Sequence, residues 1–361
     1  METKIPIYQP FLGEEERNNV NDCLRTTWIS SVGPYIALFE NKIKEYVGVK
    51  YASTVANGTV ALHTALLAAG IGKGDEVITP NFTYVASTNS ILMVGANPVF
   101  VDICDKTWNI NVNLIQEKIS SKTKAILVTN VYGFPCNFLE LHKICKKNNI
   151  LLIEDAAESF GAEYFGKKSG SLADISTFSF FGNKTLTTGE GGMVLTNSLK
   201  FHNKIDLLKN QGNSPINRYY HEIQGYNYRM TNIQAAIGCA QLDKIDNILK
   251  LKKRIDRFYR FELNDVATFQ TIENNIESSF WMTALLFEDE KQKINIDKHL
   301  EKNNIETRPL FYPIDKLPFY QKAENCYIAK KIYKKGLILP SFPQLTIEQQ
   351  EYIVKVIKRN A

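Results

Sequence analysis

The chain has few of the features that mark secreted, metal-binding or membrane proteins. Its six cysteines include no C-x-x-C pair, and no histidine stands at metal-ligand spacing, so neither a disulfide framework nor a zinc site is indicated. The first ten residues lack the apolar core of a signal peptide, and no stretch approaches the length of a membrane span. We therefore expect a soluble, cytoplasmic protein with reduced thiols and no bound metal.

The charge is neither large nor clustered. The formal net charge is +5 over 361 residues, with an isoelectric point of about 8.6. Basic runs such as 252–254 lie in amphipathic, helical stretches, and we interpret them as solvated helix faces. This pattern argues against nucleic-acid binding and suits an anionic small substrate.

Alternating short apolar runs and helical patterns between about residues 50 and 200 predict an α/β domain with a largely parallel sheet. At 44% hydrophobic residues the chain can bury one large core and a smaller one. Strands are expected at 51–55, 76–79, 98–101, 125–131, 150–153, 176–180 and 193–196. Helices are expected at 58–69, 112–119 and 138–147, with Asn113 or a neighbour capping the second.

The rest of the chain predicts a second, smaller α/β domain. Residues 231–261 carry one long helical pattern that would link the two domains, and a boundary near residue 245 gives domains of 1–245 and 246–361. In the smaller domain we expect a strand at 280–287, a helix near 296–303, the segment 306–313 and a final amphipathic helix at 347–358.

Lys184 is the most informative residue. It stands between two predicted strands, in the run S-F-F-G-N-K that begins at Ser179 and is followed by T-T-G-E-G-G. Most lysines are solvated surface charges, but Phe178, Phe180 and Phe181 give this one apolar surroundings, which lower the pKa of an amine and make it nucleophilic. This setting favours a lysine that bonds to the aldehyde of pyridoxal 5'-phosphate and shuttles a proton between the substrate carbon and C4' of the cofactor.

Asp155 is the expected partner of the cofactor ring. It follows an apolar run and should emerge at the carboxyl end of a buried strand, where ligands of open α/β sheets bind. A carboxylate there can keep the ring nitrogen of a pyridine cofactor protonated and make the ring an electron sink. A helix N-cap or a metal carboxylate is the alternative for this residue taken alone.

The junction at Asn57, Gly58 and Thr59 can bind the cofactor phosphate. Backbone N–H groups at a helix start form an anion site, the glycine permits close approach and the threonine hydroxyl adds a bond. Such junctions are common in α/β domains and are weak evidence alone. Ser179 can add a hydroxyl to the same phosphate, and Tyr84 can stack on the ring, unless it is an ordinary core aromatic.

Together these motifs resemble the DegT/DnrJ/EryC1/StrS family of pyridoxal-phosphate sugar aminotransferases of fold type I, from residue 10 to the last helix. The resemblance rests on N-G-T at 57–59, G-D-E-V-I-T-P at 74–80, E-D-A-A at 154–157, the run 179–192 and G-Y-N-Y-R-M at 225–230. It implies a large domain with a mostly parallel sheet between helices, plus a smaller C-terminal α/β domain.

The resemblance also assigns residues. It implies that Lys184 forms the internal aldimine, that Asp155 partners the pyridine nitrogen and that the phosphate ligands are Gly58, Thr59 and Ser179. Asn227 would reach the phosphate from the neighbouring subunit, so that the active site would be complete only in a homodimer.

Two positions, Glu158 and Lys184, bear on which reaction of this family the chain catalyses. Many members have Gln or His where this chain has Glu158, near the phenolic oxygen of the cofactor, and a carboxylate there would repel a phenolate unless it is protonated or turned toward the substrate. Relatives with His in place of the lysine are dehydratases of keto-deoxysugars, and Lys184 excludes that branch. Transamination is therefore favoured, and a non-catalytic cofactor-binding protein is disfavoured because the lysine, aspartate and phosphate site are all present.

The runs 26–33, 180–184 and 307–309, with Glu158, are similar to the perosamine-forming branch, which aminates C4 of GDP-4-keto-6-deoxymannose with L-glutamate as donor. The resemblance therefore implies a nucleotide-sugar substrate and L-glutamate. Amination of UDP- or dTDP-4-keto-6-deoxyglucose, of the viosamine type, is the alternative. An arginine fork suits a diphosphate and aromatic rings suit a base; the expected substrate contacts are Trp28, Ser30, Arg229, Arg308 and Tyr312.

Overall fold

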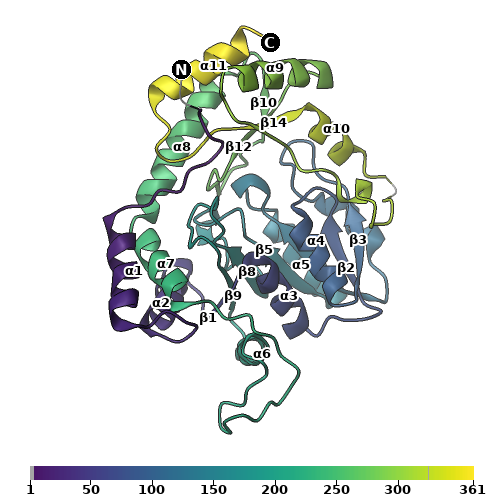
Figure 1. The fold of residues 1–361 in the computed structure, drawn as a ribbon. Helices are drawn as coiled ribbons and strands as arrows, with labels where there is room; N and C mark the ends of the chain where they lie inside the picture. The colour runs from purple at the N-terminus through teal and green to yellow at the C-terminus, as the bar shows by residue number, and fades with distance from the viewer. Residues whose placement is uncertain (1–3, 324) are drawn as a thin grey trace.

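A seven-stranded sheet forms the centre of the computed structural model, which describes residues 4–323 and 325–361 (Figure 1). Its strand order is β1-β9-β8-β5-β4-β2-β3. The strands are β1 (Tyr51–Val55), β2 (Glu76–Pro80), β3 (Asn97–Val101), β4 (Thr123–Thr129), β5 (Leu151–Asp155), β8 (Ile175–Ser179) and β9 (Gly192–Thr196). Within this sheet only β9 is reversed, because it pairs antiparallel with both β8 and β1. The prediction of a mostly parallel sheet is confirmed.

Helices cover both faces of this sheet, which explains why β4 is apolar from Ala125 to Val128 on both of its faces. Alternate residues of β4 point to opposite faces: Ala125 and Leu127 pack with α3 (Gly58–Ala68) and α4 (Val85–Met93), while Ile126 and Val128 pack with α5 (Phe138–Asn148). α6 (Leu199–Lys209) lies on the α3 side, against β1 and β9.

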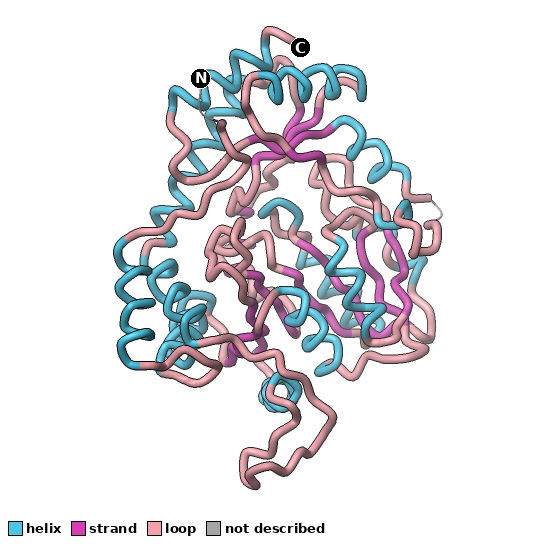
Figure 2. Tube along the Cα trace, in the orientation of Figure 1, coloured by secondary structure: helices cyan, strands magenta, loops and turns pink. Residues whose placement is uncertain are grey.

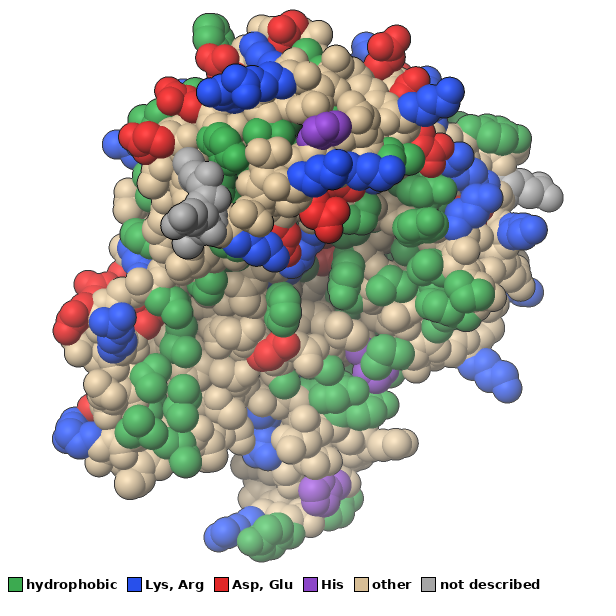
Figure 3. Space-filling model, turned by 45° about the horizontal axis from the view of Figure 1, so that its top comes forward, with side chains coloured by type: hydrophobic (Ala, Val, Ile, Leu, Met, Phe, Trp, Pro, Cys, Tyr) green, Lys and Arg blue, Asp and Glu red, His purple; other side chains and the backbone are tan. Residues whose placement is uncertain are grey.

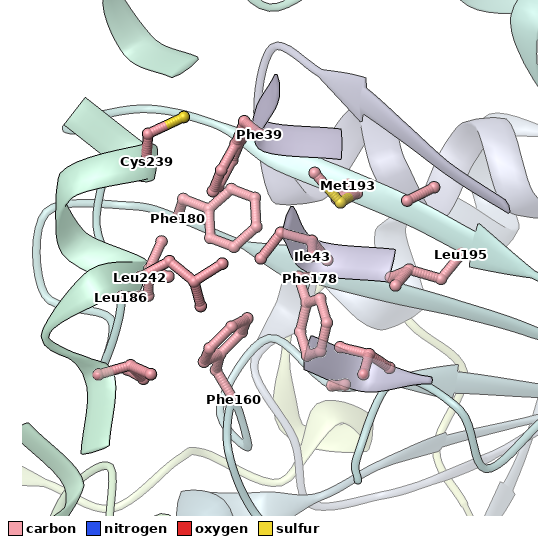
Figure 4. Close-up of a cluster of buried hydrophobic side chains, with 14 of the residues drawn as sticks. Phe39, Ile43, Phe160, Phe178, Phe180, Leu186, Met193, Leu195, Cys239 and Leu242 are labelled. Carbon is pink, nitrogen blue, oxygen red and sulfur yellow. The ribbon is translucent and has the colours of Figure 1, made fainter. Parts of the chain in front are cut away.

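A second packing layer lies over β1, β8 and β9, on the face opposite α3. It is made by α2 (Pro34–Val47) and α7 (Asn232–Asp243), with α1 (Glu14–Thr26) against α7. Figure 4 shows the aromatic and aliphatic side chains that fill the space, with Phe39, Phe160 and Phe180 turned toward one another. This core lies directly beneath the segment that carries Lys184.

The rest of the chain forms a smaller α/β unit around a sheet of order β10-β12-β14-β13 (Figure 1). Its strands are β10 (Thr268–Phe269), β12 (Thr283–Leu286), β13 (Arg308–Pro309) and β14 (Gly336–Leu339), and its helices are α8 (Ile245–Glu262), α9 (Glu290–Lys302), α10 (Tyr327–Lys335) and α11 (Ile347–Lys358). Ile5 pairs with Ile305 and is buried in the core of this unit. The N-terminal segment around Ile5 is thereby attached to the smaller unit. A third, minor sheet contains β11 (Ile276–Glu277), β6 (Glu163–Tyr164) and β7 (Lys167–Lys168).

Several sequence-based boundaries were wrong. The helix expected at 112–119 is two short turns, η1 (Val112–Leu114) and η2 (Gln116–Lys118), and the cap is Asn111, whose side chain accepts from Asn113 N. Such local side-chain bonds compete with helix formation. The strand expected at 125–131 ends at Thr129, because η3 (Val131–Gly133) follows, with Tyr132 at a φ of 55°.

The single helix expected at 231–261 is two helices, α7 and α8, with a break at Lys244. The Lys244 amine pairs with Glu16 and lies over the ring of Phe11, so contacts with the N-terminal segment hold the break in place. No local breaker residue marks this position in the sequence.

A loop of residues 212–225 projects from the molecule beyond α6 (Figure 2). It is closed by a bridge between Asn213 and His221, and its tip carries strongly exposed apolar side chains, Ile216 and Tyr219. Among the described residues, no helix is long and apolar enough to cross a bilayer, and no acidic, cysteine and histidine side chains gather as a metal site.

Candidate active site

Asp155 is the last residue of β5, and the strand register places it between Thr129 of β4 and Thr177 of β8. Its carboxyl group is buried and held on both oxygens: Ser87 Oγ donates to Oδ2 at 2.5 Å, and the backbone N–H of Ala157 donates to Oδ1 at 3.1 Å. Burial raises the pKa of Asp155, and the hydrogen bond from Ser87 opposes that rise. A cation placed here would be stabilised by a carboxylate of fixed direction.

Sequence analysis missed the hydroxyl groups behind Asp155. Thr83 Oγ1 donates to Thr129 Oγ1 at 2.8 Å and lies 3.2 Å from Ser87 Oγ, so three buried hydroxyls, two near the start of α4 and one at the end of β4, form one network. Thr83 and Ser87 are four residues apart at the start of α4. Residues four apart near a helix start can face the same way, so this spacing is the signal in the sequence that could have indicated a common hydrogen-bond partner for Thr83 and Ser87.

Lys184 lies in the segment between β8 and β9, which is fixed from both sides. Phe180 and Leu186 are fully buried in the core seen in Figure 4. Main-chain bonds from Thr188 N to Phe180 O (2.9 Å) and from Phe180 N to Gly191 O (2.8 Å) close the segment. The lysine main chain is held as well, because its carbonyl accepts from Tyr8 Oη at 2.8 Å. The side chain therefore starts from a rigid base.

The Lys184 amine faces an aromatic ring that the sequence did not reveal. Its Nζ lies 4.0 Å from the centroid of the Trp281 ring. Burial lowers the pKa of the amine, while the carboxyl groups of Glu158 and Asp155 act to raise it. The expected role of Phe181 was wrong: its side chain is 47% exposed, and the apolar face beside the amine comes from Trp281 of the smaller unit.

Glu158 is buried three residues after the end of β5, close enough to Lys184 for the two charges to interact. Its Oε2 accepts from the backbone N–H of Tyr132 at 2.8 Å. Burial, with a smaller contribution from the charge of Asp155, raises the pKa of Glu158, and the Lys184 amine opposes that rise. The carboxyl group therefore belongs to the same electrostatic cluster as the lysine.

The residues expected to bind the phosphate lie where β1 meets α3 and at the end of the neighbouring strand β8. Asn57 Oδ1 accepts from Val60 N at 3.0 Å and caps the helix. Gly58 lies so close to Ser179 that a Cβ added to it would stand 2.6 Å from the Ser179 Cβ. Thr59 is the next residue of α3 and is half-buried. The structure thus brings together the three predicted phosphate ligands at a helix N-terminus, where the helix dipole favours an anion.

Tyr84 is not a core residue. Its side chain is 56% exposed at the N-cap of α4, with its ring 6.1 Å from that of Phe311. The reading of Tyr84 as a core aromatic is therefore wrong, and its exposed face remains available to a ring ligand.

The other predicted contacts fall into two groups on this chain. Asn227 is exposed and accepts from Arg229 Nη2 at 3.4 Å, in a region to which Trp28 and Ser30 also belong. The carbonyls of Trp28 and Ser30 accept hydrogen bonds from Asn232 at the start of α7. The second group comprises Arg308 and Tyr312, both exposed, at the edge of the smaller unit.

These residues fit pyridoxal phosphate. The Gly58 position leaves no room for a side chain against Ser179, as expected where backbone N–H groups approach a phosphate. The donor set also matches, since an amine with a lowered pKa and a buried, oriented carboxylate lie at one edge of the sheet. A mostly parallel sheet with these groups at its carboxyl edge defines a pyridoxal-phosphate enzyme of fold type I.

Comparison with known proteins identifies the family. Residues 10–358 match the model of the DegT/DnrJ/EryC1/StrS aminotransferase family, and the chain belongs to that family. It is 47% identical to GDP-perosamine synthase of Escherichia coli O157:H7, covering 98% of this chain and 97% of the relative. It is 45% identical to GDP-perosamine synthase of Vibrio cholerae, covering 98% of each. The protein is therefore a pyridoxal-phosphate-dependent aminotransferase.

Solved structures agree with the fold. The chain resembles Helicobacter pylori PseC, an aminotransferase involved in pseudoaminic acid biosynthesis, with a TM-score of 0.94 and 27% identity over 99% of both chains. It also resembles Spr1654 of Streptococcus pneumoniae in its PLP form, with a TM-score of 0.93 and 27% identity, covering 99% of this chain and 100% of the other. The fold type I architecture predicted from the sequence is confirmed.

Proposed function

We propose that this aminotransferase transfers the amino group of L-glutamate to C4 of GDP-4-keto-6-deoxymannose and forms GDP-perosamine. The observation that carries the chemistry is the grouping of the Lys184 amine with the buried carboxyl groups of Asp155 and Glu158. The choice of nucleotide sugar is supported by identities of 44–47% with three GDP-perosamine synthases over nearly the whole chain.

Each residue of the site has a proposed task. Asp155, held by Ser87 and by the Ala157 backbone, keeps a proton on the cofactor ring nitrogen. Pyridoxal phosphate, when bound, supplies the electron sink and carries the amino group from donor to acceptor. The Lys184 amine holds the cofactor covalently and, when released, moves the proton at the substrate carbon.

The phosphate would be bound by Gly58, Thr59 and Ser179. Tyr84, through its exposed ring, would stack on the cofactor. Glu158 accepts a hydrogen bond from the Tyr132 backbone, and burial raises its pKa. A neutral Glu158 carboxyl group would avoid the repulsion of the phenolic oxygen that an ionised one would cause.

The proposal includes a homodimer. Hydrophobic side chains gather on the side of the molecule where α1 and α2 lie (Figure 3). Trp28, Ile29 and Val32, in the connection between these two helices, are exposed, and so are Ile216 and Tyr219 of the projecting loop. A patch of this kind favours burial against a second copy. Asn227 would then reach the phosphate bound by the partner, and the exposed contacts Arg308 and Tyr312 would meet the nucleotide sugar together with Trp28, Ser30 and Arg229.

Two further features of the proposal concern the whole chain. We place the boundary between the large and small domains at residues 245 and 246, where α8 begins. The cytoplasmic location expected from the sequence remains a prediction.

The function is tested by supplying GDP-4-keto-6-deoxymannose, UDP-4-keto-6-deoxyglucose and dTDP-4-keto-6-deoxyglucose separately, each with L-glutamate and pyridoxal phosphate. Mass spectrometry of the products is expected to find the amino sugar with the GDP substrate. Preferential amination of a UDP- or dTDP-sugar would contradict the proposed substrate and leave the aminotransferase class intact.

The role of the lysine is tested by Lys184→Ala, with Lys200→Ala as a surface control, because Lys200 is exposed on α6. We expect the first variant to lose turnover and the glutamate-dependent change in cofactor absorbance, and the second to keep both. Turnover by Lys184→Ala would show that another group moves the proton.

A further inference from the structure

Trp281 joins the smaller unit to the lysine segment through two contacts at adjacent residues. Its indole Nε1–H donates to the Asn183 carbonyl at 2.7 Å, and its ring face lies 4.0 Å from Lys184 Nζ. The side chain is 5% exposed, just before β12. One side chain therefore touches both the main chain and the amine of this segment.

The orientation of the indole is fixed by a stack of aromatic rings. The Tyr132 ring lies 6.3 Å from the Trp281 ring with an interplanar angle of 18°, and the Phe311 ring lies 5.0 Å from Tyr132 at 20°. The Tyr132 hydroxyl also accepts from the Phe311 backbone N–H at 3.2 Å. Because three separate segments of the chain contribute to the stack, the Trp281 ring cannot turn away from Lys184 without disturbing the packing of both units.

The ring and the carboxyl groups act on the amine in the same sense. Asp155 and Glu158 are the charged groups that favour the ammonium form of Lys184, and the Tyr8 hydroxyl is bound to the lysine carbonyl rather than to the amine. A tryptophan face within about 6 Å of an ammonium group favours the charged form of the amine, and more strongly when the pair is shielded from water.

We propose that Trp281 is a positioning residue which holds the free, charged amine of Lys184 against its ring and fixes the main chain beside it through Asn183. This inference rests on the proposed role of Lys184 as the cofactor lysine. It gives the amine a defined resting place whenever its bond to the cofactor is broken, and that place is supplied by the smaller unit.

The test measures how pH controls the reaction of the amine with an aldehyde. Protein freed of cofactor is mixed with pyridoxal 5'-phosphate at a series of pH values, trapped with borohydride at short times and digested, and the labelled Lys184 peptide is quantified by mass spectrometry. In the reaction the neutral amine adds to the aldehyde with loss of water, and borohydride reduces the resulting C=N bond. Only the neutral amine reacts, so the midpoint of the curve of rate against pH gives the pKa of the Lys184 amine.

Three variants separate the contributions. Trp281→Leu removes the ring and the indole N–H, and Trp281→Phe keeps a weaker ring. Trp108→Phe is the control, since Trp108 is also buried but contacts Tyr132 rather than Lys184. We expect the midpoint to fall by about half to one pH unit in Trp281→Leu, by less in Trp281→Phe and not at all in Trp108→Phe. Thermal melting measures loss of folding in all three.

An unchanged midpoint in both Trp281 variants, with Lys184 still labelled, overturns the inference and leaves Trp281 a purely structural residue. If Trp281→Leu does not fold, the Trp281→Phe midpoint decides alone. Labelling of wild-type protein at a lysine other than Lys184 would instead overturn the proposed function. The two failures are therefore distinguishable.

Discussion

Lys252 is a lysine that the sequence places on a solvated helix face and that the structure buries. The sequence places it in a basic, amphipathic run, and the prediction that this face is solvated was wrong for this residue. Its side chain is 1% exposed, Nζ donates to the Ser341 carbonyl at 2.9 Å and lies 5.3 Å from the centroid of the Tyr8 ring. Burial lowers the pKa of Lys252 to about 7.

The buried amine makes stability depend on pH. Between the folded pKa of about 7 and the ordinary value of 10.5, the unfolded chain binds more protons at Lys252 than the folded one, so stability rises with pH in this window. We expect Lys252→Met to remove this dependence, so that its gain in stability over wild type is about 2 kcal/mol larger at pH 7 than at pH 9. Denaturant titrations at both pH values measure the difference.

The matched control is Lys250→Met on the same helix, because Lys250 is exposed. This variant should show the pH dependence of wild type. An equal effect of Lys252→Met at the two pH values would mean that the amine stays charged inside the protein.

Residues whose roles follow from local sequence were the ones that could be predicted. Lys184 and Asp155 stand in short motifs, and the structure brings both to one edge of the sheet. Trp281 lies 98 residues from Asn183, the residue whose carbonyl it binds, and no local pattern connects the two. Ser87 could be predicted only in part, because its spacing from Thr83 is visible in the sequence but its partner Asp155 lies 68 residues away.

At the scale of elements, the junction of β1 and α3 is the point where geometry is tightest. A methyl group at Gly58 would stand 2.6 Å from Ser179 Cβ and 2.9 Å from its Oγ. We expect Gly58→Ala to weaken binding of pyridoxal phosphate by roughly tenfold or more, because shifting the junction costs hydrogen bonds to a charged phosphate. Fluorescence titration of cofactor-free protein measures the affinity.

Gly72→Ala is the control for that substitution, since the nearest atom to its added methyl group would be 3.8 Å away. It should bind the cofactor as wild type does. Equal affinities for the two variants would show that the phosphate is bound elsewhere.

Elements were predicted best where one regular pattern runs along the whole element. The strands at 51–55 and the helix at 347–358 match their expected bounds. The failures at 112–119 and at Lys244 share a cause, because helical periodicity says nothing of a competing side-chain bond at Asn111 or of a distant partner such as Glu16. A local side-chain bond overrides the helical pattern at Asn111, and a tertiary contact overrides it at Lys244.

At the scale of the whole molecule, the proposed dimer predicts that two inactive variants can restore activity when their subunits are mixed. Lys184→Ala and Asn227→Ala should each be impaired, because each removes one part of every site. If Asn227 serves the partner's phosphate, mixed subunits of the two variants form hybrids in which one site keeps both residues. We expect activity to reappear on mixing after partial unfolding and refolding.

Hybrid formation is verified by light scattering and by mass spectrometry of the intact assembly. Ile216→Ser with Tyr219→Ser, at the exposed tip of the projecting loop, should weaken that assembly. Hybrids that form but remain inactive would mean that Asn227 serves its own chain.

The attachment of the N-terminal segment to residue 305 has a consequence for the order in which the protein is completed during synthesis. Ile5 pairs with Ile305, and Ile7 donates to Glu306, 299 residues later. This segment is synthesised early, and its apolar side chains stay exposed until residues 305 and 306 have been synthesised. Tyr8 lies in that segment and holds the Lys184 carbonyl, and Trp281 also comes late. We therefore expect the Lys184 segment to reach its final packing only after residues 281–306 have been synthesised.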